Sequence, residues 1–502
     1  METLNNLALG LETAFQAYNL FHCFIGALLG TIVGVLPGVG PTATIAMLLP
    51  LTFSLGPETA LIMLAGIYYG AQYGGSTTAI LLNLPGEATS AVTAIDGFQM
   101  ARKGQGGPAL AIAAIGSFFA GTVATFIIAF TATALTSVAL RFGPAEYFSL
   151  IIFGLTCSIT LAHGSVFKAI VMIDLGLLLG MIGTDVNSGE QRFTFGLLGL
   201  YEGLNVVALA VGIFGISEVF RNFEERKNGE STSVIAVDRL MPSREQFRRA
   251  RWPILRGTAI GSLLGVLPGG GALLSSFASY AMEKRLSSTP NEFGKGAIEG
   301  VAGPESANNA GSQTSFIPML TLGIPSNAVM AMMVGAMIMQ GIQPGPSVVS
   351  SHPTLFWGLI ASMWVGNLML VVLNLPLVGL WVRLLKVPYW ALFPAIIAFS
   401  AIGIFSFNNS GFDLYVFIGS GVVAYFFLKL GFEPTPFLLG FVLGPMMEEY
   451  LRRAMVLSRG SLIVFVQSPI SAFFLASTVV LLTLAALPKL GRRRQEIFVD
   501  QD

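Results

Sequence analysis

Charge is scarce in this sequence of 502 residues: only 11% are charged, whereas a soluble domain carries about 25% charged residues. Hydrophobic residues make up 54%, and the formal net charge is zero. A chain with so few charges and no excess of basic residues lacks the electrostatic surface that nucleic-acid binding needs. The composition therefore excludes nucleic-acid binding and predicts an all-α polytopic membrane protein in contact with the lipid bilayer.

Cysteine and histidine are also rare, with two and three copies. Cys23 and Cys157 lie in apolar runs, where a small, inert, buried side chain is the simplest interpretation. The three histidines show no metal-ligand spacing, and no GxxxxGKS/T loop for nucleotide phosphates is present. We therefore expect no enzyme, with no catalytic residue and no metal site. We also expect no cofactor apart from a coupling ion.

What the sequence does have is a repeated interruption of its apolar runs. GALLGTIVGVLPGVGPTAT at residues 26–44 recurs as GTAIGSLLGVLPGGGALLS at residues 257–275. A second pair follows, YYGAQYGGSTTAILLNLPGEA at residues 68–88 and ANNAGSQTSFIPMLTLGIPSNA at residues 307–328. The chain therefore consists of two related halves.

Apolar stretches long enough to cross a bilayer, such as residues 313–340, occur in both halves, since a spanning helix needs roughly 20 residues. The apolar pieces after the two Pro-Gly interruptions are shorter and predict broken or re-entrant helices. Roughly eleven or twelve helical elements result. We assign residues 1–220 to a first membrane repeat, 221–252 to a linker, 253–430 to a second repeat, and 431–502 to a C-terminal membrane segment with a basic tail.

The linker at residues 221–252 and the C-terminal tail after Lys489 are both rich in arginine and lysine. Since cytoplasmic loops carry an excess of these residues, we predict that the linker and the C-terminus are cytoplasmic. In the second half, the number of spans does not place the basic segments as consistently on one side of the membrane. Parallel and inverted arrangements of the two halves therefore both stay open.

Pro37 and Pro268 stand inside apolar runs and are followed by clustered glycines. Proline lacks the amide hydrogen and glycine permits positive φ, so the helix stops and leaves bare peptide groups. In hydrocarbon such groups cost several kcal/mol each unless they line a polar cavity or meet a ligand. The helix that restarts points its positive dipole end at the break, which suits a carboxylate. Pro85 and Pro325 are the helix-breaking residues of the second motif pair.

The glycines and short polar side chains around these breaks form the candidate substrate site, because hydroxyl and amide groups donate hydrogen bonds to carboxylate oxygens. The candidates are Gly38, Gly40, Thr42, Thr44, Ser76, Thr77, Thr78 and Asn83 in the first half, and Gly269, Gly270, Gly271, Ser275, Asn308, Asn309, Ser312, Thr314, Ser326 and Asn327 in the second. Hydrogen bonding between helices explains any single one equally well. As two clusters beside two breaks, they favour a site.

Two further interpretations concern neighbouring residues. Glu305 directly precedes Ser306, and a carboxylate inside a membrane is costly enough to indicate function, so this pair is the candidate for ion coupling. A loop carboxylate in water is the alternative. The small-residue series upstream of each break is better explained by close helix packing. Its members are Gly26, Gly30 and Gly34 in the first half and Gly257, Gly261 and Gly265 in the second.

These motifs resemble the large membrane subunit of the tripartite tricarboxylate transporter family. The resemblance covers nearly the whole chain and rests on GVLPGVGPTATIAMLLPLTF, YYGAQYGGSTTAILLNLPGEATSAVTAIDGFQMARKGQGGPAL and GPESANNAGSQTSFIPMLTLGIPSNAVMAMMVGAMIMQGIQPGP. It implies a multi-pass secondary transporter of the bacterial inner membrane that works with a small membrane subunit and a periplasmic substrate-binding protein. It also implies symport of carboxylates such as citrate with sodium or protons, and an elevator motion of a transport domain.

We therefore expect a secondary active importer of a small carboxylate, with one site at the interface of the repeats. A passive channel is the first alternative, and a membrane enzyme acting on lipid-linked substrates is the second. A channel would pass ions without saturable substrate dependence, so a gradient-dependent uptake assay separates it from a transporter. An enzyme would need a catalytic base or metal, which metal analysis of the purified protein tests.

Replacing Pro37 and Pro268 together by alanine is predicted to abolish uptake while the protein still folds and inserts. Alanine restores the amide hydrogen, so each helix would continue through its break and withdraw the peptide groups that we expect to hold cargo. Uptake into reconstituted vesicles measures the effect. Unchanged transport by the double variant would refute this role of the breaks.

Overall fold

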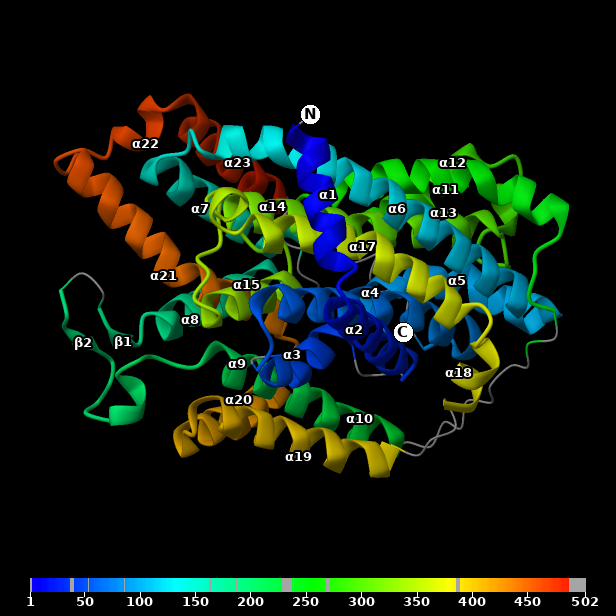
Figure 1. The fold of residues 1–502 in the computed structure, drawn as a ribbon, viewed down its shortest axis with the longest axis horizontal. Coiled ribbons are helices and arrows are strands. Elements are labelled where there is room, and N and C mark those ends of the chain that lie inside the picture. Colours follow the sequence, from blue (N-terminus) through cyan, green and yellow to red (C-terminus); the bar gives the residue numbers. More distant parts are fainter. Residues whose placement is uncertain are drawn as a thin grey trace.

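The computed structural model describes residues 2–36, 40–52, 54–84, 86–161, 165–185, 188–227, 237, 239–267, 271–384 and 389–486. Over these residues the chain is almost entirely helical, with a single short antiparallel hairpin (Figure 1). Within the same ranges, four helical segments are long and apolar enough to cross a membrane: Ala17–Val35, Ala88–Ala139, Pro353–Asn374 and Gly411–Lys429. The predicted all-α polytopic membrane class is confirmed.

The first half begins with α1 (Glu2–Ala14), α2 (Ala17–Val35), α3 (Pro41–Thr52), α4 (Pro57–Leu82), η1 (Ala88–Ser90), α5 (Ala91–Met100), η2 (Ala101–Gln105), α6 (Gly106–Ala139), α7 (Pro144–Leu161) and α8 (Val166–Gly180). It continues with β1 (Gly183–Thr184), β2 (Gln191–Arg192), η3 (Leu198–Leu200), α9 (Val206–Ala210), η4 (Val211–Ile216) and α10 (Ser217–Lys227). The strands pair Gly183 with Arg192 and Thr184 with Gln191.

The second half contains α11 (Arg244–Leu264), α12 (Gly271–Leu286), η5 (Pro290–Glu292), α13 (Glu299–Thr314), α14 (Phe316–Leu322), α15 (Ala328–Met339), α16 (Val348–Ser351), α17 (Pro353–Asn374) and α18 (Val378–Leu384). The chain ends with α19 (Tyr389–Asn408), α20 (Gly411–Lys429), α21 (Pro434–Leu457), α22 (Val464–Gln467) and α23 (Pro469–Ala486). The helical elements outnumber the expected eleven or twelve because breaks divide runs that the sequence presents as one. The run at residues 313–340, for example, forms α14 and α15.

The two halves repeat one packing arrangement, in which α2 lies on α4 and α11 lies on α13. Glycines allow the backbones to touch. A Cβ atom added to Gly30 would lie 2.2 Å from the carbonyl oxygen of Ile67, and one added to Gly261 would lie 2.3 Å from that of Ala307. No side chain fits between helices this close. The predicted packing role of the upstream glycines is confirmed.

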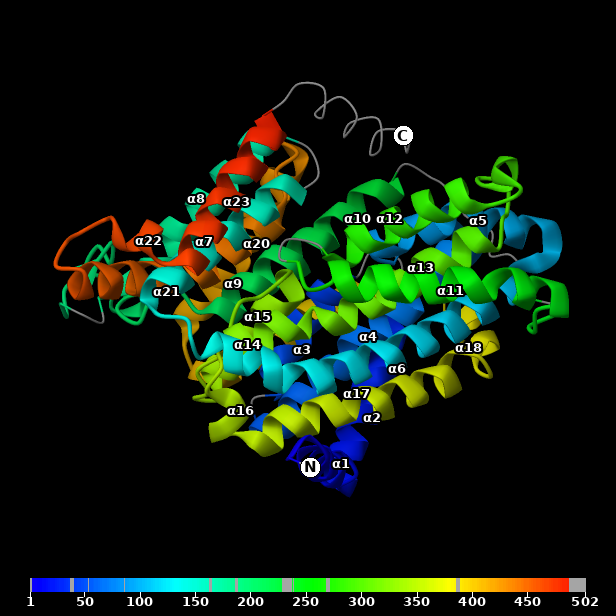
Figure 2. The ribbon, with the colours of Figure 1, turned by 90° about the horizontal axis from the view of Figure 1, so that it is seen from above.

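The helices form two groups that lie side by side in Figure 2. By their packing contacts, the first group contains α2, α4, α5, α6, α11, α12, α13 and α17, and the second contains α7, α8, α9, η4, α10, α19, α20, α21 and α23. Two shorter helices connect the groups: α3 packs on α4 and on η4, and α15 packs on α4 and on α21. Both follow an interruption of a repeat, so the breaks lie where the groups meet.

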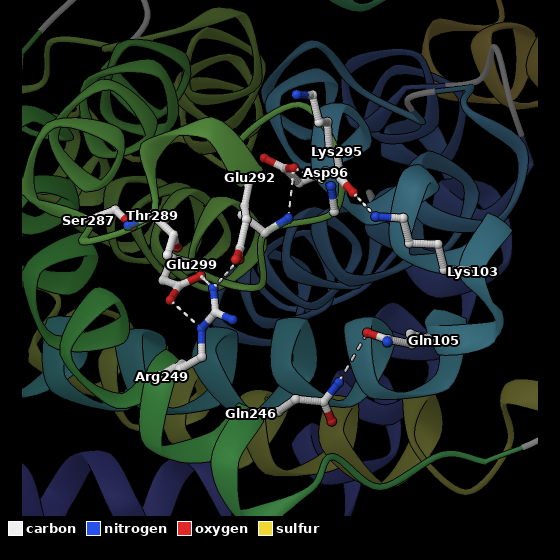
Figure 3. A network of polar contacts seen from close by, with 12 residues as sticks. Asp96, Lys103, Gln105, Gln246, Arg249, Ser287, Thr289, Glu292, Lys295 and Glu299 are labelled. Atoms are coloured by element: carbon white, nitrogen blue, oxygen red, sulfur yellow. Dashed lines mark hydrogen bonds and ion pairs between the residues drawn. The ribbon is translucent and has the colours of Figure 1, made fainter.

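A network of polar contacts ties the halves together at one end of the first group (Figure 3). Asp96 of α5 is completely buried and accepts hydrogen bonds from the backbone amides of Gly296 (2.7 Å) and Ala297 (2.9 Å). Beside it, Arg249 of α11 donates to Glu292 at 2.7 Å, and this hydrogen bond lowers the pKa of the Glu292 carboxyl. The first half is therefore fixed to the loop between α12 and α13.

The variant Gly30→Ala is predicted to lower the stability of the protein by about 1–3 kcal/mol, because its methyl group overlaps the backbone of α4. Thermal unfolding of the purified protein measures this. Gly419→Ala on α20 is the matched control, since a Cβ atom there has nothing within 4 Å. Equal melting temperatures for the two variants would show that the close backbone contact does not hold α2 and α4 together.

Candidate functional site

A cavity of about 420 Å³ lies between the two groups of helices. The first group and the connecting helices contribute residues from all four interruptions of the repeats: 40–42, 87–89, 272–273 and 327–329. The second group contributes residues of α7, η4, α10 and α20 and the start of α21. Sites for small molecules in proteins have volumes of roughly 300–1,000 Å³, so the cavity is large enough for one.

Several helices begin at this cavity. The first residues of α3, α15 and α21, which are Pro41, Ala328 and Pro434, line it, and so does Ala272 in the first turn of α12. The amide groups of a first helical turn have no partner within the helix, and the dipole makes that end positive. In α15 the side chain of Asn327 accepts a hydrogen bond from the amide of Met330 at 2.9 Å. The helix starts on the wall are therefore suited to an anion such as a carboxylate, while Glu87, Glu218 and Glu433 give other parts of the wall negative charge.

The helices α4 and α14 both end at a residue with a left-handed backbone conformation. Asn83 follows α4 with a φ of 57°, and Gly323 follows α14 with a φ of 73°. Both values lie in the left-handed region that stops a helix. Each residue directly precedes a proline motif, Leu84-Pro85 or Ile324-Pro325. Asn83, predicted as a binding residue, is exposed and caps α4 in the structure.

Glu305 lies on α13 between the two halves and is completely buried. Its carboxylate accepts hydrogen bonds from Ser76 of α4 and from Thr93 of α5, the latter at 3.2 Å. Asn309, one turn further along α13, donates to Ser117 of α6 at 2.7 Å. The donors around Glu305 are hydroxyl groups, whose oxygens are also ligands for a sodium ion, and the carboxylate can equally carry a proton. Glu305 therefore brings a carboxylate of the second half into contact with hydroxyl groups of the first half.

A second carboxylate, Glu87, connects this buried cluster to the cavity. Glu87 lines the cavity and accepts a hydrogen bond from the amide of Asn308 at 3.2 Å. Its neighbour Thr89 donates to the amide oxygen of Gln72, also at 3.2 Å. Gln72 and Asn308 stand at equivalent positions of the repeats, three residues before Gly75 and Gly311. The side-chain amides of these two equivalent residues therefore both contact the segment at residues 87–89.

Of the predicted binding residues, Gly40, Thr42 and Asn327 line the cavity. Others are buried behind its wall, where their hydroxyl groups bond to helix carbonyl groups: these are Thr44, Thr78, Ser275, Thr314 and Ser326. Ser306, predicted to couple ions with Glu305, donates to the carbonyl of Ala302 at 2.8 Å. These positions show how the side chains support the helices around the cavity.

The remaining predicted residues lie elsewhere. Ser76 and Thr77 line a small void beside Tyr73 and Ser117. Ser312 donates a hydrogen bond to Asn308 at 3.5 Å, and Gly271 is the first residue of α12. Pro325 lies between α14 and α15. Six residues fall outside the part of the chain that the structure describes: Pro37, Gly38, Pro85, Pro268, Gly269 and Gly270.

Sequence reasoning missed most of the polar residues on the cavity wall. These are Tyr68, Gln72, Thr89, Ser158, Ser217, Glu218, Arg221, Glu433 and Thr435. Arg221 was assigned to the start of the linker because its neighbours are basic, yet it lies on α10 and lines the cavity. Tyr68, Gln72 and Thr89 lie within or directly after the second repeated motif, but no motif marks the others, which come from helices far apart in the sequence. The residues of α10 could have been identified only from the proximity of this helix to the starts of α3, α12 and α15.

Comparison with known proteins extends over both halves of the chain. A profile described as "Tripartite tricarboxylate transporter TctA family" matches residues 20–439. An "Uncharacterized 52.8 kDa protein in TAR-I ttuC' 3'region" of Agrobacterium vitis is 61% identical over 502 residues, which is 100% of both chains. An "Uncharacterized protein in TAR-II ttuC' 3'region" of the same organism is 62% identical over 242 residues, 48% of this chain and 100% of that protein. No solved structure matches.

Proposed function

The chain belongs to the tripartite tricarboxylate transporter TctA family, and we propose that it is a secondary active importer of a small carboxylate, driven by a sodium or proton gradient. The observation that carries this proposal is the cavity of about 420 Å³, which residues from all four interruptions line. Helix starts from both halves offer it amide groups and positive dipole ends. A carboxylate such as citrate fits the cavity in size, and its charge suits these helix starts.

The proposed importer acts in the bacterial inner membrane with two partners, a small membrane subunit and a periplasmic substrate-binding protein. The family description names a tripartite system, which supports a requirement for two further components. The binding protein would deliver the carboxylate to the cavity. The arrangement of the helices supports an elevator motion, because the cavity lies between two groups of helices, and α3 and α15 contact both groups beside the breaks.

The coupling ion is proposed to bind at Glu305. Ser76 and Thr93 complete its surroundings with hydroxyl oxygens. Asn308 lies one helical turn from Glu305 on α13 and contacts Glu87 at the cavity. Ion binding at Glu305 therefore has a short route of polar contacts to the substrate, which supports coupling between the two.

Filling the cavity is the direct test of the proposed site. Gly40→Leu is predicted to abolish saturable citrate uptake by cells that express the chain with its small membrane subunit and binding protein. The nearest atom to a Cβ atom at Gly40 is the Gly86 carbonyl oxygen at 3.9 Å, so the leucine enters open space beside the cavity and the protein still folds. Gly271→Leu is no substitute, since its Cβ atom would lie 2.3 Å from the Leu264 carbonyl oxygen.

The matched control for Gly40→Leu is Gly379→Leu, which adds the same side chain where nothing lies within 4 Å of the Cβ position. It should transport like the unchanged protein. Normal uptake by Gly40→Leu would refute the site. Citrate flux that persists without an ion gradient and does not saturate would instead indicate a passive channel.

Glu305→Gln is predicted to abolish gradient-driven accumulation of citrate while exchange of citrate across the membrane continues. The amide keeps the shape of the side chain but neither carries a proton nor offers a charge to sodium. Vesicles loaded with citrate and supplied with labelled citrate measure exchange, and an imposed sodium or proton gradient measures accumulation. The control Glu292→Gln makes the same change in the half-exposed polar network of Figure 3. Full accumulation by Glu305→Gln would place the coupling ion elsewhere.

A further inference from the structure

Arg221 gives the cavity a feature that the repeats do not explain. Among the described residues on the cavity wall it is the one that carries a positive side-chain charge, and it comes from α10 in the second group of helices. Its guanidinium donates a hydrogen bond to Glu218, one turn earlier on the same helix, at 2.7 Å. Glu218 also lines the cavity. The cation and its carboxylate partner are therefore both within reach of a ligand.

The Arg221–Glu218 ion pair is open to water, because the two side chains are 46% and 20% exposed. An ion pair in contact with water contributes little to stability, and long side chains that form one retain the freedom to exchange partners. Arginine presents a planar fork of N–H donors that matches a carboxylate with two parallel hydrogen bonds. A substrate carboxylate can therefore compete with Glu218 for Arg221.

Only the second side of the cavity, among the described residues, adds a side-chain cation to its helix start. The first group and the connecting helices offer backbone amides at the starts of α3, α12 and α15, whereas the second group offers the start of α21 and, in addition, a guanidinium. A ligand with one carboxylate satisfies one of these features and leaves the other unchanged. A ligand with two or more carboxylates satisfies both at once and thereby connects the two groups of helices.

We propose that Arg221 determines the substrate specificity of the cavity by exchanging Glu218 for one carboxylate of a substrate that carries at least two. The other carboxylate binds at the helix starts of the first wall. In the structure Glu218 neutralises Arg221, so the guanidinium has a counter-charge that a substrate carboxylate can replace. The inference rests on the proposed function, because it requires that the cavity be the carboxylate site.

The test is equilibrium binding of citrate to the large subunit together with its small membrane subunit in nanodiscs, without the binding protein. Arg221→Gln is expected to raise the Kd for citrate roughly 10-fold to 100-fold, the range for losing a charged hydrogen-bond partner. Arg221→Lys should have an intermediate effect, since lysine keeps the charge but not the fork. The advantage of succinate over acetate in displacing citrate should fall by a similar factor in Arg221→Gln. If Arg221 only stabilised the fold of α10, the ratio between the acetate and succinate concentrations needed to displace citrate would be unchanged.

A charge swap separates ligand binding from helix stabilisation. Glu218→Arg combined with Arg221→Glu restores the ion pair on α10 in the opposite order, yet it moves the cation away from position 221. Weak citrate binding by this double variant supports the proposal, whereas wild-type affinity would overturn it. Arg453→Gln is the control, because it breaks a comparable exposed ion pair with Glu449 on α21, outside the cavity. It should bind citrate normally.

The outcomes for Arg221 and Gly40 distinguish the inference from the function on which it rests. If Gly40→Leu abolishes citrate binding while Arg221→Gln leaves the Kd and the succinate preference unchanged, the cavity is the site and the role of Arg221 is wrong. If neither variant alters citrate binding, both the site and the inference are wrong. Should Arg221→Gln fail to fold, Arg221→Lys and the charge swap give the same decision.

Discussion

Peptide groups inside a membrane must find hydrogen-bond partners, and this constraint organises the structure. A continuous helix satisfies its own backbone, whereas an interrupted one exposes amide and carbonyl groups at considerable cost. The chain interrupts its helices at equivalent places in both halves and brings the interruptions to one cavity, where residues 40–42, 87–89, 272–273 and 327–329 form the wall. The exposed amides gain a polar environment there, and the cavity gains helix starts suited to anions.

Rigid and exchangeable contacts occur in different parts of the molecule. Backbone contacts at glycines hold α2 on α4 and α11 on α13, and buried Asp96 fixes α5 to the loop before α13 through backbone amides. The groups that face the cavity from α10 form a half-exposed ion pair instead. Contacts made through backbones have one geometry, whereas exposed charged side chains can change partners. Such a division suits a transporter, which must keep a site intact while its contents change.

The sequence by itself determined the class of fold, the internal repeat and the approximate positions of the breaks. These properties are local: scarcity of charge and long apolar runs predict membrane helices, and proline or clustered glycines end them wherever they stand. The packing role of Gly30 and Gly261 was also readable, because small residues four apart in an apolar run allow backbones to approach. The resemblance to a transporter family followed from the same motifs.

Tertiary structure alone decided which side chains share the cavity and which support it. Thr78 and Thr314, predicted as ligands, bond to carbonyl groups of their own helices, while Asn83 caps α4. Arg221, read as part of a basic linker, lies on the cavity wall. A hydroxyl beside a break can face a ligand or its own helix, and the local sequence is the same in both cases. The choice depends on the direction of each helix face and on the packing of α10 beside the restarted helices, which no pattern within one segment encodes.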